Sequence, residues 1–260
     1  MRLDSALVAR GLVDSRTKAQ RRIHAGDVLV DGVVVTKMSW NVDEGAQIEV
    51  TGSPDYVGRG ARKLVAALDE WGIDPTGLLA VDIGASTGGF TQVLLERGAA
   101  RVVAIDVGHG QLHPNLADDS RVDSHEGFNI RDITSSWWSE RVGQKPGLIT
   151  IDVSFISLRQ VIPVVVEALG HCDWIALVKP QFEVGKGGVK EGIVTNPDLR
   201  ESALTAVLEA AVESGLGVRA LMASPITGES GNTEFLCWLS PTHGRNPPQW
   251  SEHIHQLAHS

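Results

Sequence analysis

The sequence predicts two folded parts: a small α+β unit over residues 1–52 and a larger, doubly wound α/β domain over residues 59–241. Residues 2–50 show two short helical patterns and then β-branched runs around a tight turn, whereas apolar runs alternate with helical patterns from Lys63 onward. Such alternation is typical of a parallel sheet with helices on both faces. The segment SPDYVG, residues 53–58, contains Pro and Gly without periodicity, so we predict that it is a linker.

In the small unit, the helical spacing of Leu3 and Leu7 predicts a first helix. Ser15 is predicted to cap the start of a second helix, and Gly26 to end it. Asp31-Gly32 lies between two β-branched runs, which is a strong signal for a hairpin. A further strand is expected near residues 47–50.

The charge of the small unit is distributed unevenly. Residues 1–52 carry seven basic and seven acidic side chains, so residues 53–260, with sixteen basic and twenty-five acidic, supply the whole net charge of −9. Because Ala19 and Ile23 define the inward side of the second helix, we expect its cations to face solvent, where a local basic patch can attract a polyanion. The alternative is an ordinary solvated helix face. The cations of this segment are Arg16, Lys18, Arg21 and Arg22.

The larger domain is predicted from its apolar runs and helical patterns. Buried strands are expected at 79–83, 102–105, 148–153 and 174–178. Helices are expected at 90–97, 157–169 and 198–214. The run 235–239 follows a Gly-rich loop, which suggests an antiparallel strand closing the sheet, and residues 242–260 form a polar tail or a short helix.

The overall composition excludes several classes of protein. Apolar residues make up 42% and charged residues 21%, which is ordinary for a globular chain with a core. Two cysteines without a CxxC motif make no disulfide framework. No apolar run reaches the roughly 20 residues of a spanning helix, and the charged N-terminal segment is unlike a signal peptide. We therefore expect a cytoplasmic protein that does not act in a membrane.

Three glycines, Gly84, Gly88 and Gly89, separate the first strand of the large domain from its helix. A ligand at this turn would meet the N-terminus of a helix. Asp106, at the end of the next strand, is placed to accept both ribose hydroxyls of a nucleoside. The spacing DxGxxxGG lacks the GxGxxG pattern of dinucleotide-binding proteins, which argues against an NAD oxidoreductase. A tight turn without a ligand is the other interpretation.

Four further residues are expected to converge on this region. Asp152 and Lys179 end two strands, Lys63 lies on the helix before the first strand, and Glu234 precedes the last strand. Because ligands of open α/β sheets bind at the carboxyl ends of the strands, this set is difficult to explain as unrelated surface residues.

These motifs carry a family resemblance. The segments RGARKL, DIGASTGGFT, DVGHGQL, DVSFISL, VKPQFEVGKG and SGNTEF resemble the FtsJ-like ribose 2′-O-methyltransferases. The order helix, basic helix, DG hairpin resembles the S4 RNA-binding domain. Together they resemble the TlyA family from residue 2 to about residue 240. The resemblance implies an S-adenosylmethionine (SAM) dependent methyltransferase fold with a mostly parallel seven-stranded sheet.

The resemblance also implies a substrate and residue roles. TlyA proteins methylate a cytidine ribose in large-subunit rRNA, and some also act on small-subunit rRNA, which confers sensitivity to capreomycin-type antibiotics. The implied catalytic tetrad is Lys63, Asp152, Lys179 and Glu234. Lys179 is the candidate general base, or it orients an oxygen lone pair. The implied SAM contacts are Asp82, Gly84, Ala85, Ser86, Thr87, Gly88, Gly89, Phe90, Asp106, Asn129 and Asp152. The expected RNA contacts are Arg16, Lys18, Arg21, Arg22, Arg59 and Arg62.

We expect no metal site, since His109 and His113 flank Gly110 and precede Pro114 rather than sharing a helix face. The expected partners are ribosomal RNA or ribosomal subunits, with no obligate protein partner and a monomer or weak dimer. Two alternatives remain at this stage: a non-catalytic RNA-binding protein, and a haemolysin, because members of the family carry that name.

Overall fold

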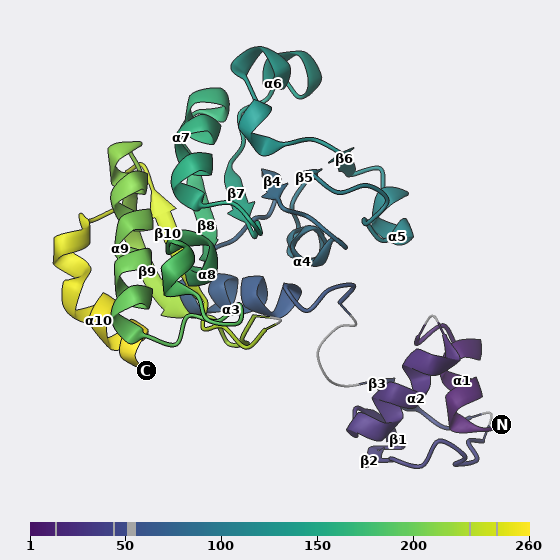
Figure 1. The fold of residues 1–260 in the computed structure, drawn as a ribbon. Helices are drawn as coiled ribbons and strands as arrows, with labels where there is room; N and C mark the ends of the chain where they lie inside the picture. Colours follow the sequence, from purple (N-terminus) through teal and green to yellow (C-terminus); the bar gives the residue numbers. More distant parts are fainter. Residues whose placement is uncertain (14, 44, 51–55, 229, 243) are drawn as a thin grey trace. The chain divides into compact units, whose positions relative to one another are not determined.

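A computed structural model describes residues 1–260 apart from residues 14, 44, 51–55, 229 and 243 and the side chains of residues 21, 25 and 186 (Figure 1). The chain divides into two compact units, Met1–Asp55 and Tyr56–Ser260. Residues 53–55 of the predicted linker lie outside the described residues. Val57, which also falls in the predicted linker, belongs to the large unit, where its backbone N–H donates a hydrogen bond to Gln92 Oε1 at 2.9 Å.

The small unit packs two helices on a three-stranded antiparallel sheet of order β2-β1-β3. Its core contains Leu3, Leu7 and Ile23, all fully buried. The elements are α1 (Leu3–Ala9), α2 (Arg16–Ala25), β1 (Val28–Val30), β2 (Val33–Val34) and β3 (Ile48–Val50).

Local sequence signals explain how these elements begin and end. Ser15 Oγ accepts a hydrogen bond from the backbone N–H of Lys18, and Gly26 ends α2 in the left-handed conformation at φ 81°. Asp31 and Gly32 both have positive φ, at 51° and 79°. This is the backbone that a two-residue type I′ hairpin requires, so the predicted hairpin is confirmed.

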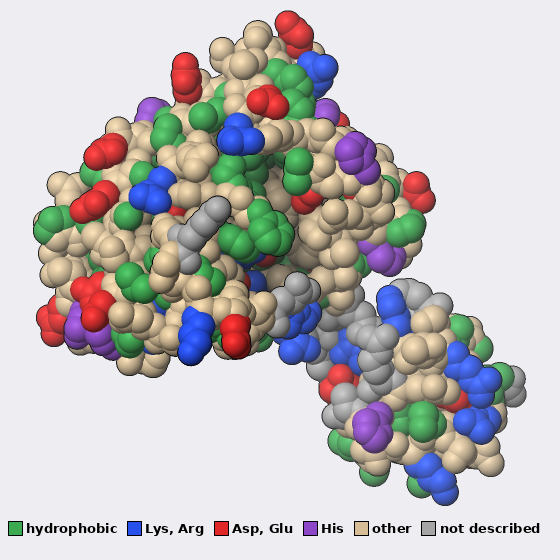
Figure 2. Space-filling view, in the orientation of Figure 1, with side chains coloured by type: hydrophobic (Ala, Val, Ile, Leu, Met, Phe, Trp, Pro, Cys, Tyr) green, Lys and Arg blue, Asp and Glu red, His purple; other side chains and the backbone are tan. Residues whose placement is uncertain are grey.

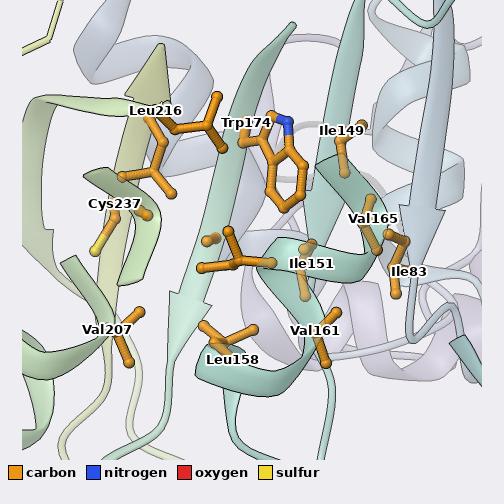
Figure 3. Close-up of a cluster of buried hydrophobic side chains, with 14 of the residues drawn as sticks. Ile83, Ile149, Ile151, Leu158, Val161, Val165, Trp174, Val207, Leu216 and Cys237 are labelled. Atoms are coloured by element: carbon orange, nitrogen blue, oxygen red, sulfur yellow. The ribbon is translucent and has the colours of Figure 1, made fainter. Parts of the chain in front are cut away.

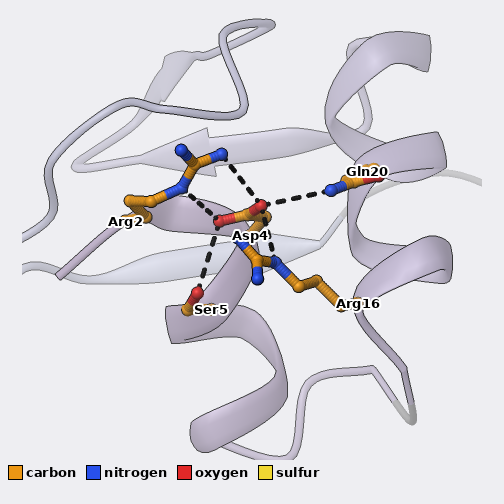
Figure 4. A network of polar contacts seen from close by, with 5 residues as sticks. All are labelled: Arg2, Asp4, Ser5, Arg16 and Gln20. Atoms are coloured by element: carbon orange, nitrogen blue, oxygen red, sulfur yellow. Dashed lines mark hydrogen bonds and ion pairs between the residues drawn. The ribbon is translucent and has the colours of Figure 1, made fainter.

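A buried carboxylate links the two helices of the small unit (Figure 4). Asp4, on α1, is fully buried. It accepts hydrogen bonds from Arg2 at 3.1 and 3.2 Å, from Arg16 at 3.0 Å and from Gln20 at 3.3 Å. Hydrogen bonds from the Arg2 guanidinium are the main reason that the pKa of Asp4 lies well below its usual range. Asp4 therefore stays ionised and holds α1 to α2.

The large unit is built on a seven-stranded sheet of order β6-β5-β4-β7-β8-β10-β9. Its strands are β4 (Leu79–Ile83), β5 (Arg101–Asp106), β6 (Val122–Glu126), β7 (Leu148–Ile151), β8 (Asp173–Val178), β9 (Gly217–Ala223) and β10 (Phe235–Ser240). Its helices are α3 (Ala61–Trp71), α4 (Gly89–Glu96), α5 (Pro114–Ala117), η1 (Ile130–Asp132), α6 (Ser135–Arg141), α7 (Leu158–Leu169), α8 (Pro180–Glu183), η2 (Lys186–Gly188), α9 (Pro197–Glu213), η3 (Pro247–Trp250) and α10 (Ser251–His259).

Two hydrophobic layers cover the two faces of this sheet. Along β4, Val81 and Ile83 belong to one layer and Ala80 to the other, as the period of a strand requires. The first layer includes side chains of α6, α7, α9 and α10, with Trp174 fully buried at its centre (Figure 3). The second layer includes side chains of α3, α4 and α5.

Strand β10 runs antiparallel to both of its neighbours, β8 and β9. The predicted direction is therefore confirmed. The strand does not close the sheet, however, because it is inserted between β8 and the edge strand β9. Its reversed direction has a consequence for the site: the start of β10 lies at the same end of the sheet as the carboxyl ends of the parallel strands.

The C-terminal segment 242–260 contains a helix that packs on the sheet domain. In α10, Ile254 and Ala258 are buried, and α10 lies against α9 and β9 (Figure 1). No helix in the described part of the chain is both long enough and apolar enough to cross a membrane.

Candidate active site at the carboxyl ends of the strands

Two adjoining cavities open at this end of the large unit. One, of about 800 Å³, is lined by Asp106 and Asn129 and is called here the Asp106 cavity. The other, of about 710 Å³, is lined by the four residues of the predicted tetrad and is called the Lys179 cavity. Both volumes are typical of small-molecule sites. The cavities share six lining residues, which are Gly84, Ser86, Asp152, Ser154, Phe155 and Phe182.

The first ion pair of the Lys179 cavity is buried. Lys63, on α3, and Glu234, directly before β10, are 7% and 3% exposed. Lys63 Nζ donates a hydrogen bond to Glu234 Oε2 at 2.6 Å across 171 positions of sequence. A Cβ on Gly228 would lie only 2.5 Å from Glu234 Oε1, so a glycine makes room for this carboxylate. Such a pair is costly to separate, because either charge alone would be left desolvated.

The second ion pair lies where β7 and β8 end. Lys179 Nζ is 2.6 Å from Asp152 Oδ1 and donates a hydrogen bond to Ser154 Oγ at 3.0 Å. Lys179 follows β8 directly and precedes Pro180, the first residue of α8. The parallel pairing of β7 and β8 thus brings Asp152 and Lys179 to one edge, as the strand-end argument predicts.

The three glycines of the first turn are explained by contacts within the protein itself. At Gly84, with φ 85°, a Cβ would lie 2.5 Å from the carbonyl oxygen of Asp152. At Gly88, with φ 96°, it would collide with the Leu116 side chain. At Gly89 it would press on the backbone of the residue that begins α3, 3.1 Å away. The glycines therefore allow the turn to approach the β7 loop, α5 and α3.

Asp106 uses both carboxylate oxygens to fix neighbouring loops. Its Oδ2 accepts a hydrogen bond from Ser86 N at 2.8 Å, and its Oδ1 accepts one from Gly108 N at 2.7 Å. Asn129 lines the same cavity, and its Oδ1 accepts a hydrogen bond from Arg131 N at 3.1 Å. These backbone contacts hold the two side chains on the cavity wall.

The predicted cofactor contacts divide into three groups. The first group lines the Asp106 cavity and comprises Gly84, Ser86, Asp106, Asn129 and Asp152. A further group lines the Lys179 cavity but not the Asp106 cavity, and it comprises Ala85, Thr87, Gly89 and Phe90. Gly88 lines neither cavity, because its open side is filled by Leu116 and Leu112.

Asp82, another of the predicted cofactor contacts, also lines neither cavity. It is fully buried within β4. Thr91 Oγ1 donates a hydrogen bond to its Oδ2 at 2.7 Å, and Thr150 Oγ1 donates one to its Oδ1 at 3.2 Å. Burial raises the pKa of Asp82 to about 7, although these hydrogen bonds oppose the shift. Asp82 thus ties β4 to α4 and β7.

The basic residues of α2 require a correction. Arg22 is buried rather than solvent-facing, and its Nη1 lies 3.1 Å from Asp27 Oδ2. Arg16 is exposed, but it is engaged with Asp4. Lys18 is half-buried, and the side chain of Arg21 lies outside the described part of the structure. In the large unit, Arg59 and Arg62 are both exposed, and Arg59 lines the Lys179 cavity.

The structure adds two features that the sequence did not indicate, the exposed ring of Phe155 and the backbone contacts of Glu126. The family resemblance implied only that the segment Glu126 to Arg131 lies near the adenine of the cofactor. Phe155 lines both cavities, is 91% exposed and has φ 63°, a conformation that is rare for a bulky residue. Its ring centroid lies 5.1 Å from that of Phe182. Glu126, at the end of β6, accepts hydrogen bonds from the backbone N–H groups of three consecutive residues, at 2.9, 2.7 and 3.1 Å. These three residues are Gly110, Gln111 and Leu112. No local sequence signal marks either feature, because both depend on how separate loops meet.

Comparisons with known proteins agree with this architecture. A model of the FtsJ-like methyltransferase family matches residues 56–240, and a model of the S4 domain matches residues 1–48. The 16S/23S rRNA (cytidine-2′-O)-methyltransferase TlyA of Mycobacterium tuberculosis is 45% identical, over 92% of this chain and 89% of its own length. Hemolysin A of Brachyspira hyodysenteriae is 41% identical, over 91% and 98%.

A solved structure from Streptococcus thermophilus, which carries a hemolysin designation, is 36% identical with a TM-score of 0.73, and the match covers 100% of this chain and 95% of that one. Family models and relatives together span both units. The chain therefore belongs to the TlyA family, whose members join an S4 domain to an FtsJ-like, SAM-dependent methyltransferase domain.

Proposed function

We propose that this protein transfers a methyl group from SAM to the ribose 2′-hydroxyl of a cytidine in ribosomal RNA. The observation that carries the proposal is the convergence of two lysines and two carboxylates, from four separate elements, around the Lys179 cavity. The printed names of the M. tuberculosis relative and of a Campylobacter jejuni relative, a 23S rRNA (cytidine-2′-O)-methyltransferase, support the choice of substrate.

The residues of the Asp106 cavity fit the cofactor. A carboxylate at the end of the second strand is suited to the ribose hydroxyls of a nucleoside, and Asp106 stands there. Asn129 and the backbone at Gly84 complete the wall. Bound there, SAM would supply an electrophilic methyl group attached to a positively charged sulfur. Asp152 is the one tetrad residue that lines both cavities, so it would lie between cofactor and substrate.

In this proposal the Lys179 cavity holds the ribose. Lys179 Nζ contacts the 2′-hydroxyl oxygen and either accepts its proton or directs a lone pair toward the methyl group. Asp152 and Ser154 hold Lys179 Nζ in place, at 2.6 and 3.0 Å. The first role requires Lys179 to be a neutral amine, which becomes an ammonium group on taking the proton, whereas an ammonium group can fill only the second. The buried Lys63–Glu234 pair forms a fixed second wall. Positioning the reacting atoms about 3–3.5 Å apart supplies much of the rate enhancement.

We assign RNA binding to residues 1–52 and the reaction to residues 59–241, joined by the linker 53–58. The match of residues 1–48 to the S4 domain supports the first assignment. Because Arg22 is buried, the proposed phosphate contacts are the exposed cations Arg16, Arg59 and Arg62. The substrate places the protein with ribosomal subunits in the cytoplasm.

The test uses labelled SAM with purified small and large ribosomal subunits that lack the modification. We expect label on a cytidine 2′-oxygen, lost in Lys179→Ala and retained in the matched control Lys145→Ala, an exposed lysine outside both cavities. No transfer to either subunit or to free rRNA would overturn the proposed substrate. Transfer that survives Lys179→Ala would remove only the role of Lys179. Release of dye from liposomes by a protein that transfers no methyl group would favour a membrane-lytic function instead.

A further inference from the structure

A second cluster of ionisable side chains lies outside the lining of both cavities, where α10 meets the beginning of α9. Ile254 and Ala258 anchor α10 in the core. The residues that follow each of them, His255 and His259, are therefore carried along one edge of the helix, one turn apart. Glu201, half-buried on α9, lies opposite both rings.

The donor atoms of these three residues are close together. Glu201 Oε2 lies 2.8 Å from His255 Nδ1 and 3.2 Å from His259 Nε2, and the three donor atoms fall within 4.8 Å of one another. The two imidazole centroids are 4.0 Å apart. Asp198 Oδ1 adds a fourth oxygen, 3.5 Å from His259 Nε2. Among the described residues, no other group of three His, Cys, Asp or Glu side chains meets this spacing.

These distances suit a small transition-metal ion. Zn²⁺ binds His nitrogens and carboxylate oxygens at about 2.0–2.2 Å, so tetrahedral ligand atoms lie roughly 3.3 Å apart. Small side-chain rotations would bring the three donors to that spacing. Imidazole nitrogens favour ions of the zinc class over Ca²⁺ or Mg²⁺, which take oxygen ligands.

The electrostatic setting favours a cation. A surface hollow of about 430 Å³ on α9 is lined by the three carboxylates Asp198, Glu201 and Glu209. Acidic and histidine side chains gather over α10 and the adjoining end of α9 (Figure 2). The large unit as a whole carries more acidic than basic residues. A divalent ion there would relieve repulsion between carboxylates.

We propose that α9 and α10 form a binding site for a Zn²⁺-class divalent cation, with His255 Nδ1, His259 Nε2 and Glu201 Oε2 as ligands and Asp198 or water in the fourth position. The role is structural. The ion would fasten the C-terminal helix to α9, which packs in turn on α8, the short helix after Lys179. The site is independent of the proposed methyl transfer.

The expectation of no metal site was argued from His109 and His113, and it overlooked a second pair of histidines. His255 and His259 share the i, i+4 spacing of helical metal ligands, but their partner Glu201 lies 54 positions before His255. The set becomes visible only when α10 is known to be a helix that packs on α9.

The experiment titrates ZnCl₂ into the full-length, tag-free protein by calorimetry and uses Co²⁺ absorption as an independent probe of coordination. We expect one ion per chain, visible-region bands typical of a four- or five-coordinate nitrogen and oxygen site, and a rise of several degrees in the melting temperature at saturating Zn²⁺. His255→Ala and His259→Ala should each weaken binding at least about tenfold, since even changes behind a ligand cost that much.

Two control variants change residues outside the proposed ligand set. His24→Ala removes an exposed histidine of the small unit, and Glu209→Gln removes a carboxylate of the hollow that is not a proposed ligand. Both should bind Zn²⁺ like the original protein. An equal loss in Glu209→Gln would mean diffuse electrostatic attraction rather than a built site. Absence of stoichiometric binding, or binding unchanged in both histidine variants, would overturn the site.

Discussion

Asp4 in the small unit and Asp82 in the large unit are both fully buried, yet their pKa values are shifted in opposite directions. Asp4 accepts hydrogen bonds from two guanidinium groups and an amide, so its pKa is lowered. Among the described side chains, the donors to Asp82 are two threonine hydroxyls, and burial raises its pKa to about 7. The partners of a buried carboxylate, rather than its depth, decide whether it is held as an anion.

The largest expected effect on stability is that of Asp4→Ala. This change removes the acceptor that Arg2, Arg16 and Gln20 share, and we expect the small unit to lose about 2–4 kcal/mol of unfolding free energy. Hydrogen exchange followed by mass spectrometry, which resolves the two units, should show faster exchange throughout α1 and α2. Equal loss of protection in the large unit would contradict the assignment of Asp4 to a local network.

The two aspartates should also differ in a pH series, because they change the unfolding free energy with pH in opposite directions. The folded pKa of Asp4 lies below its unfolded value, so its contribution is present above about pH 4 and is lost as the pH falls further. The folded pKa of Asp82 is raised, so its contribution is complete below about pH 4 and is lost as the pH rises to 7. Each slope is at most about 1.4 kcal/mol per pH unit.

The measurement is urea-dependent hydrogen exchange of each unit between pH 3 and pH 8. We expect the small unit to weaken toward pH 3. The large unit should show a component that weakens between pH 4 and pH 7. Identical pH profiles for the two units would contradict the opposite pH dependence assigned to Asp4 and Asp82.

A neutral replacement of Asp82 should have a smaller effect. Asp82→Asn keeps the shape of the side chain and removes its titration, so we expect a loss of about 1 kcal/mol at pH 6 from imperfect pairing with Thr91 and Thr150. The same variant should lose the alkaline weakening of the large unit, whereas Asp4→Asn should not. A pH profile unchanged by Asp82→Asn would assign that component to another group.

Glu126 offers the mildest test, as a carboxylate whose pKa is lowered chiefly by backbone N–H groups. Those groups belong to the loop before α5, which includes Gln111 of the Asp106 cavity. We expect Glu126→Gln to raise the KM for SAM several-fold while kcat stays within about twofold, since an amide oxygen accepts fewer and weaker hydrogen bonds. A several-fold fall in kcat with an unchanged KM would instead mean that Glu126 acts on the reaction step.

Much of the fold could be predicted because strong local signals agreed with the final structure. Ser15, Gly26 and Asp31-Gly32 act through their own backbone, and the central strands are apolar on both faces. The edge strands β6 and β9 were missed, because each is only partly buried. The segment of β6, VDSHE, is mostly polar, and the apolar run of β9, GVRALMA, is interrupted by Arg219. Sequence periodicity reveals a strand through its buried apolar side chains. An edge strand buries fewer of them, so its pattern is weak even though its backbone pairs with the neighbouring strand.

The site was predictable to a similar extent. Asp152 and Lys179 could be placed because parallel strands end together. The sequence could not show that Asp82 is buried away from both cavities, because a carboxylate inside an apolar run has the same pattern whether it faces a cavity or the hydroxyls of Thr91 and Thr150. Arg22 was expected in solvent because the inward stripe of α2 was defined from Ala19 and Ile23 alone, without its partner Asp27.

The reversed strand β10 also sets an order of events during synthesis. Lys63 is made early, and its partner Glu234 is made 171 residues later, at the start of the strand that enters the sheet between two others. A partly synthesised large unit can contain Asp106, Asp152 and Lys179 while Lys63 still lacks its counter-charge. Completion of the site is thereby tied to near-completion of the polypeptide.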